Sequence, residues 1–222
     1  MKFCHPDIEP VFDTEIDKIN TLVVENQRLL FNLLTDINAQ LDGHDGRAIV
    51  SRDNTPLQTS KYLELLDRFV PFDINRKQLL SAAAARLEKI AVEDISFVKT
   101  MELLGALEEH LSTLAFELNC DIDFPKLSIS SLIKASGISF RDDYPTLGEK
   151  LTDYFEAVTE LERPKLFITL NLRSFISDEE TELLLDTVIG NGYNMIMIES
   201  SERARLKKEK RHVIDADLCA IY

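Results

Sequence analysis

LFITLNLRSFISDEETELLLDTVIGNGYNMIMI, residues 166–198, sets out a strand, a helix and a second strand in succession. The runs Leu166–Leu170 and Met195–Ile198 contain no charged residue, which is typical of strands buried on both faces of a sheet. Between them, Ser177–Glu180 has the pattern of a capping box that opens a helix, and a glycine turn at 190–192 ends it. This order predicts a parallel sheet covered by helices, which is an α/β fold.

The first third of the chain repeats the theme. Thr21–Glu25 predicts another buried strand, and Asn26–Leu41 is amphipathic at helical spacing up to a turn at Gly43–Gly46. The remaining strand candidates are Ala48–Ser51, Tyr62–Leu66, Val213–Ile214 and Leu218–Tyr222, the last two as a terminal hairpin or paired edge strands.

Asn75–Asn119 differs from the rest, because it has no proline and a single glycine. Apolar residues recur in it every three or four positions, which predicts two long helices packed against each other, with a break at Glu93 and Asp94. The two stripes are Leu79, Ala83, Leu87 and Ile90, then Leu104, Leu107, Leu111, Leu114 and Leu118.

A third, shorter helix is predicted at Ser128–Ala135, closed by Gly137. Ile138–Phe140 then leads back to the sheet, and Thr146–Leu161 predicts a further helix. We therefore expect an α/β head in two parts, residues 1–74 and 137–222, with an inserted α-helical domain at residues 75–136.

The composition is that of a globular protein, with 45% hydrophobic and 29% charged residues. No apolar run approaches the roughly 18 residues that span a bilayer, and the N-terminus lacks the pattern of a signal peptide. Cys4, Cys120 and Cys219 are widely spaced, which fits neither a disulfide framework nor a zinc site. We expect a cytoplasmic protein with reduced thiols and no membrane partner.

A concentrated basic segment contrasts with the net charge of -14. Only Glu209 offsets its charge, and phosphate is the natural neutralising partner, since it binds Lys and Arg without sequence readout. We predict DNA contact here; the alternative interpretation is a solvated surface helix. The residues are Arg203, Arg205, Lys207, Lys208, Lys210 and Arg211.

Motifs of catalysis are missing from the sequence. The turn after the first strand, Glu25–Arg28, has no glycine or lysine to cradle phosphate, and Asn171 stands where an acidic residue would hold magnesium in a nucleotide hydrolase. The four histidines lack regular spacing, and no GxSxG nucleophile motif occurs. We expect no enzymatic activity.

Asp121 and Asp123 follow the second long helix, one turn after Glu117. Their carboxylates could surround a hard cation such as calcium. The alternative is a solvated acidic helix end, which opposes the helix dipole slightly.

Several segments together resemble the ring-forming adaptation protein of type II-A CRISPR–Cas systems, the Csn2 family. Their order and spacing extend over nearly the whole chain, although each segment alone is weak. They are Glu9-Pro10, Thr21–Glu25, Phe72–Asn75, Ser131–Ile138, Lys165–Asn171, Phe175–Glu180, Met195–Glu199 and Val213–Asp217.

The resemblance implies a head related to P-loop ATPase folds but without nucleotide chemistry, and an inserted α-helical domain. It implies a homotetrameric ring that encloses double-stranded DNA, binds its free ends without sequence preference and is held by calcium. It also implies a role in spacer acquisition beside the CRISPR integrase and effector nuclease, without enzymatic activity.

Residue by residue, Asp121 and Asp123 match acidic positions of the family's calcium region, and Lys134 matches a basic position beside the ring interior. Pro125, Lys126 and Ser131 stand where relatives carry more carboxylates, so calcium binding should be weaker. The basic segment after Glu199 is not a family hallmark, and its contact with DNA is inferred from charge alone.

Two other functions stay open at this point. One is a scaffold that recruits proteins and has no direct role with DNA. The other is a metal-dependent nuclease that uses Asp121 and Asp123, although two acids are few for a two-metal site.

Overall fold

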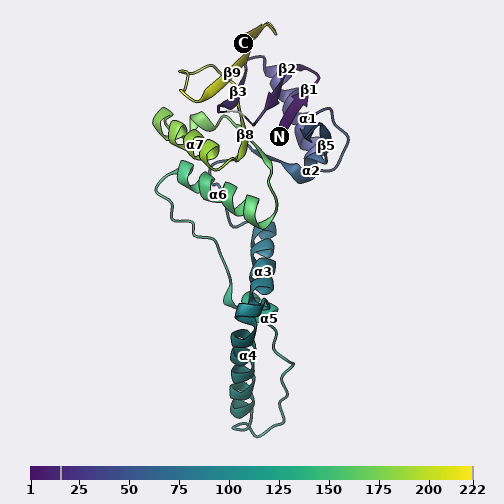
Figure 1. The fold of residues 1–222 in the computed structure, drawn as a ribbon, viewed down its shortest axis with the longest axis vertical. Helices are drawn as coiled ribbons and strands as arrows, with labels where there is room; N and C mark the ends of the chain where they lie inside the picture. Colours follow the sequence, from purple (N-terminus) through teal and green to yellow (C-terminus); the bar gives the residue numbers. More distant parts are fainter. Residues whose placement is uncertain (16, 222) are drawn as a thin grey trace. The chain divides into compact units, whose positions relative to one another are not determined.

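The computed structural model describes residues 1–15 and 17–221. The chain divides into two compact units, unit 1 with Met1–Phe72 and Asp142–Tyr222, and unit 2 with Asp73–Arg141 (Figure 1). Among the described residues, unit 1 contains all the strands and unit 2 contains three helices.

Unit 1 is built on a six-stranded sheet in the order β10-β9-β3-β8-β7-β6. Five neighbouring strands are parallel, and β10 is antiparallel to β9. The mixed α/β class with a parallel sheet is therefore confirmed, as is the terminal hairpin, although Tyr222 lies outside the described residues. The bounds are β3 Ile19–Val24, β6 Leu63–Leu66, β7 Leu166–Leu170, β8 Asn194–Glu199, β9 Glu209–Ile214 and β10 Ala220–Ile221.

The three long helices of unit 1 begin where a capping side chain satisfies a free backbone amide. Asn26, Thr146 and Ser177 accept backbone N–H groups at the starts of α1 (Gln27–Leu41), α6 (Leu147–Leu161) and α7 (Asp178–Gly190). The predicted capping box is half wrong, because Glu180 accepts the N–H of Gly148 in α6. Its carboxylate thus caps the neighbouring helix. A short 3-10 helix, η1 (Leu172–Ser174), connects β7 to α7.

A second, antiparallel sheet has the order β2-β1-β4-β5. The sequence predicted only one of its strands, near β4. Its pairing joins residues far apart in the chain, such as Phe3 with Val50. The bounds are β1 Lys2–His5, β2 Ile8–Asp13, β4 Ile49–Arg52 and β5 Thr55–Leu57, followed by the one-turn helix α2 Thr59–Tyr62.

The two faces of the six-stranded sheet have different coverings, because neighbouring residues of a strand point to opposite faces. One face packs against α1 and the second sheet in a core that includes Leu22, Leu33 and Phe3. On the other face, Phe167 of β7 stacks on Phe155 of α6 with ring centroids 4.2 Å apart. Arg211 lies on this second face, in register with Thr21, Met197 and Thr169, two residues from Phe167.

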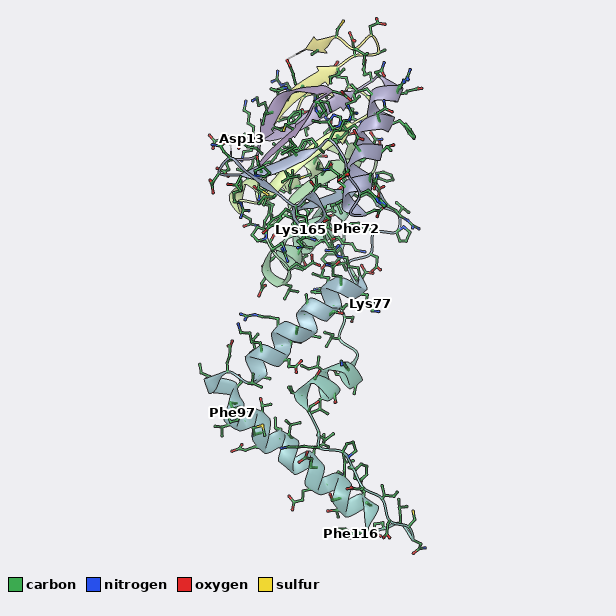
Figure 2. All side chains as sticks on the ribbon, turned by 90° about the vertical axis from the view of Figure 1, so that its right-hand side faces the viewer. Asp13, Phe72, Lys77, Phe97, Phe116 and Lys165 are labelled. Atoms are coloured by element: carbon green, nitrogen blue, oxygen red, sulfur yellow. The ribbon has the colours of Figure 1, made fainter. Side chains whose placement is uncertain are left out.

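Unit 2 consists of α3 (Lys77–Ala91), α4 (Asp94–Ala115) and α5 (Ile129–Ser136). The prediction that the two long helices pack against each other is wrong: they follow each other end to end with a change of direction (Figure 2). α3 packs against α5 instead. Leu111 of α4 faces the segment 116–128, since it lines one hollow with Phe124 and Leu127.

The return segment Ile138–Phe140 forms no strand. Its backbone is held within unit 2, because the Asn75 side chain donates to the Phe140 carbonyl and accepts its N–H, at 3.1 and 2.6 Å. In the part of the chain that the structure describes, no helix combines the length and apolar character needed to cross a membrane.

Candidate nucleic-acid interface

The basic segment lies mostly in an irregular connection between β8 and β9, residues 200–208, which we name the basic loop. Lys210 and Arg211 belong to β9 itself. The alternative interpretation of this segment, a surface helix, is therefore wrong.

Two residues of β9 anchor the basic loop, the buried Glu209 and the partly buried Arg211. The side chain of Arg211 is 9% exposed, and its Nε and Nη2 donate to the carboxylate of Glu209 at 3.0 and 2.7 Å. Its guanidinium also donates to the carbonyls of Arg203 and Ala204, at 2.7 and 3.0 Å. Glu209 accepts the N–H of Leu206 at 2.9 Å. Arg211 therefore fixes the loop backbone at Arg203 and Ala204.

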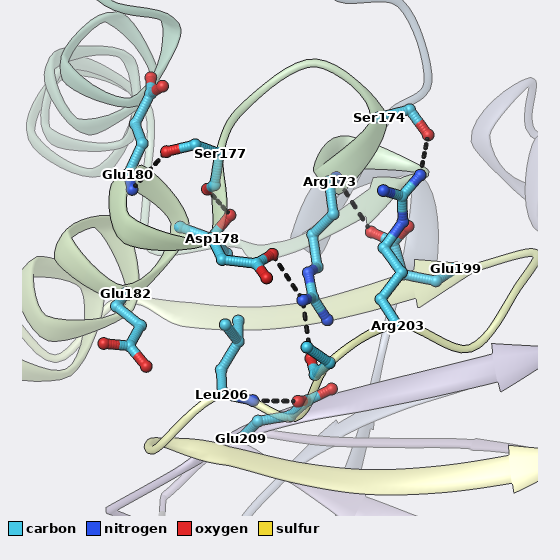
Figure 3. A network of polar contacts seen from close by, with 12 residues as sticks. Arg173, Ser174, Ser177, Asp178, Glu180, Glu182, Glu199, Arg203, Leu206 and Glu209 are labelled. Atoms are coloured by element: carbon cyan, nitrogen blue, oxygen red, sulfur yellow. Dashed lines mark hydrogen bonds and ion pairs between the residues drawn. The ribbon is translucent and has the colours of Figure 1, made fainter.

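Arg173 in η1 provides a second buried anchor (Figure 3). Its Nη2 donates to Asp178 at the start of α7 and to the Ala204 carbonyl, each at 2.7 Å. Its backbone N–H donates to Glu199 at the end of β8. Burial raises the pKa of the Glu199 carboxyl, and the Arg173 N–H and the charges of Arg203 and Arg173 oppose that rise.

Two lysines of the basic loop form ion pairs with α7. Lys207 lies 3.2 Å from Glu182, and Lys208 lies 2.8 Å from Asp186. Arg203 donates to the hydroxyl of Ser174 at 2.9 Å. Glu182 also accepts the backbone N–H of Lys207 at 3.3 Å, whereas the side chain of Lys207 is 86% exposed.

Arg205 and Lys210 differ from the other four basic residues. Both are exposed, and neither has an ion-pair partner within residues 1–15 and 17–221. The predicted DNA-binding residues of this segment thus divide into three groups. Arg211 is a partly buried anchor, Arg203, Lys207 and Lys208 have partners at the surface, and Arg205 and Lys210 are exposed without an ion pair.

Lys134 lies in unit 2, in the last turn of α5, and is exposed. It lines a groove of about 560 Å³ between α3 and α5, together with Lys77 and Glu88. Its prediction as a phosphate contact stays separate from the basic loop, which belongs to unit 1.

Asp121 and Asp123 are exposed in the segment between α4 and α5, where Asp123 accepts the N–H of Phe124 at 2.9 Å. Lys126 lines the same hollow, of about 530 Å³, and its charge opposes a cation there. The described residues contain no group of three or more His, Cys, Asp or Glu placed to hold a metal ion. Calcium takes 6–8 oxygen ligands, so these two residues of one chain do not fit a calcium site by themselves.

The positions where a nucleotide hydrolase would bind phosphate carry other interactions. β3 and α1 are connected by Glu25 and Asn26 alone, and Asn26 caps α1 by accepting the N–H of Leu29 at 2.9 Å. Asn171, with φ of 52°, accepts the N–H of Ser200 at 2.8 Å. Asn26 thus caps α1, and Asn171 connects the end of β7 to the residue after β8.

Sequence reasoning missed the acidic residues of α7 that pair with Arg173 and with the lysines of the basic loop. Asp178, Glu182 and Asp186 recur every four residues on α7, which places them on one face of the helix. That spacing is visible in the sequence and could have suggested an acidic stripe. Arg173 and Glu199 carry no local signal, because tertiary packing alone brings them together.

Comparisons with known proteins agree with this architecture. The family model described as CRISPR-associated protein (Cas_Csn2) matches residues 40–218. The CRISPR-associated protein Csn2 of Enterococcus faecalis is 22% identical over 193 residues, 86% of this chain and 85% of that protein. The crystal structure of Stu0660 of Streptococcus thermophilus matches with a TM-score of 0.56 and 15% identity, over 100% of this chain and 76% of that one. The structural match shows the fold, and the family match shows that the chain belongs to the Csn2 family of CRISPR-associated proteins.

Proposed function

We propose that this protein is a non-enzymatic, sequence-independent binder of double-stranded DNA ends. It acts as a homotetrameric ring and supports spacer acquisition in CRISPR immunity, beside the integrase and the effector nuclease. Membership of the Csn2 family supports the pathway. The observation that carries DNA binding is the set of exposed cationic side chains along an otherwise acidic chain: Arg205, Lys207 and Lys210.

These side chains suit the phosphate backbone rather than the bases. Arg205 and Lys207 lie on an irregular loop and not on a groove-reading helix or strand, and phosphate contacts carry no sequence information. Charge is also distributed unevenly, since residues 73–141 hold ten acidic and eight basic residues, against 29 and 17 in the rest. Unit 2, with Lys134, is thus less repelled by DNA than unit 1.

We also propose that the protein neither binds nor hydrolyses a nucleotide. We regard the parallel sheet as P-loop-ATPase-like, with unit 2 as an inserted helical domain. The two-residue connection of Glu25 and Asn26 leaves no loop to wrap a phosphate. For calcium, Asp121 and Asp123 would need further oxygen ligands, from water or from another copy of the chain.

Fluorescence anisotropy with two linear duplexes of unrelated sequence tests the proposal. We expect equal Kd values for the two sequences and a linear fall of log affinity with log salt concentration. A strong preference for one sequence would contradict backbone binding.

The same titration separates the two alternatives. A scaffold without a direct DNA role predicts no binding even at low salt. A metal-dependent nuclease predicts shortening of the duplex with magnesium or manganese, and loss of that activity in Asp121→Asn/Asp123→Asn.

A further inference from the structure

The acidic stripe of α7, Asp178, Glu182 and Asp186, faces Arg173 of η1 and two lysines of the basic loop. Residues four apart lie one above another on a helix, about 6 Å apart at 1.5 Å per residue. Asp178 binds Arg173, Glu182 binds Lys207, and Asp186 binds Lys208. Each acid of the stripe therefore has one cation opposite it.

The three pairs differ in how firmly they are fixed. The side chain of Arg173 is 1% exposed, and it also holds the Ala204 carbonyl. Arg211 and Glu209 fix the same backbone from the sheet side. The pairs of Lys207 and Lys208 are at the surface instead, with lysine side chains 86% and 47% exposed.

Surface and buried pairs have different consequences for a competing anion. Breaking a buried pair strands a charge away from water, whereas an exposed pair exchanges its partner at little cost. The ammonium groups of Lys207 and Lys208 can leave α7 by side-chain rotation alone. The loop backbone stays anchored by Arg173 and Arg211 while they do so.

From this geometry we infer that Glu182 and Asp186 form an autoinhibitory contact that competes with the DNA backbone for Lys207 and Lys208. The inference rests on the proposed function, because it assigns a regulatory element to the same DNA-binding surface. Carboxylate and phosphate are interchangeable partners for an ammonium group. DNA contact requires the two lysines to move from α7 to phosphate, so α7 weakens binding at low salt.

The test compares the full chain with Glu182→Gln/Asp186→Asn, by anisotropy with a labelled linear duplex. We expect about two- to twentyfold tighter binding at low salt, the product of two exposed ion pairs. The gain should shrink as salt rises, because exposed pairs are screened. The matched control is Glu160→Gln/Glu179→Gln, which removes the same charge from exposed positions of α6 and α7. Within the described residues, neither side chain forms an ion pair with the basic loop.

The same substitutions in a Lys207→Gln/Lys208→Gln background complete a double-mutant cycle. The inference requires the gain to disappear there, since the competing lysines are gone. A gain that persists there, or that equals the control, overturns the inference in favour of general charge repulsion. Binding by all variants without any gain overturns it and leaves the proposed function standing. If neither the wild type nor the Glu182→Gln/Asp186→Asn variant binds duplex at low salt, both proposals fail.

Discussion

Arg211→Met should destabilise the fold far more than a change at any exposed residue of the basic segment. The substitution keeps an apolar stem but removes the cation that the Glu209 carboxylate contacts through two nitrogens. Glu209 is 1% exposed and would keep only the N–H of Leu206. A buried carboxylate would then be left without its counter-charge.

The size of the effect follows from the burial of Glu209, which is 1% exposed. Breaking a buried ion pair from one side costs about 3–5 kcal/mol. We therefore expect a fall in Tm of about 6–20 °C for a chain of this size.

Thermal unfolding followed by circular dichroism measures this loss. Arg205→Met is the control, because Arg205 is exposed and surface changes stay within about 0.5 kcal/mol. Adding Glu209→Gln to Arg211→Met removes the stranded charge and should recover part of the Tm. The reasoning fails if Arg211→Met has the same Tm as Arg205→Met. It also fails if adding Glu209→Gln to Arg211→Met recovers none of the lost Tm.

Three further changes test other parts of the structure. Ser177→Ala removes the side chain that accepts the Glu180 N–H at the start of α7, and should cost about 1 kcal/mol in urea unfolding, with exposed Ser201→Ala as the unaffected control. Burial, aided by the charge of Lys210, lowers the pKa of His212; the unfolded chain therefore binds this proton first, and stability should fall as pH drops below about 6.5. His212→Asn should flatten that fall, and an unchanged pH dependence of Tm would exclude His212 as its source. Lys134→Glu should weaken duplex binding equally for all sequences and lower the salt slope by about one, whereas an effect no larger than that of Lys99→Glu would remove Lys134 from the interface.

Local signals explain the elements that the sequence predicted well. β7 and β8 are uncharged apolar runs over most of their length, and Asn26, Thr146 and Ser177 mark helix starts by capping their own first turns. These features depend on residues within one or two turns of the chain. Their positions could therefore be predicted to within a few residues.

The missed elements depend on distant partners. β1 pairs with β4 across more than forty residues, so four residues such as Lys2–His5 show no strand signal alone. The leucines of α4 are spaced for an apolar neighbour, but spacing does not identify that neighbour, and the segment 116–128 takes the place expected for α3.

The same limit applies to the basic segment. The density of basic residues predicted a contact with DNA. The pairing of Lys207 and Lys208 with α7 could not be predicted, because it arises only in the folded chain. The contacts of Arg211 with the loop have a similar origin, because they require β9 to pair with β3, a strand far away in the sequence.

A gel shift with linear and covalently closed circular duplexes of the same sequence tests the central claim most directly. It is run with calcium and with chelator. A ring threads DNA through its ends, so the account predicts binding to linear DNA alone, and loss of that binding with chelator would place calcium in the assembly. Equal binding to linear and circular DNA would contradict the threaded ring and indicate an open cationic surface.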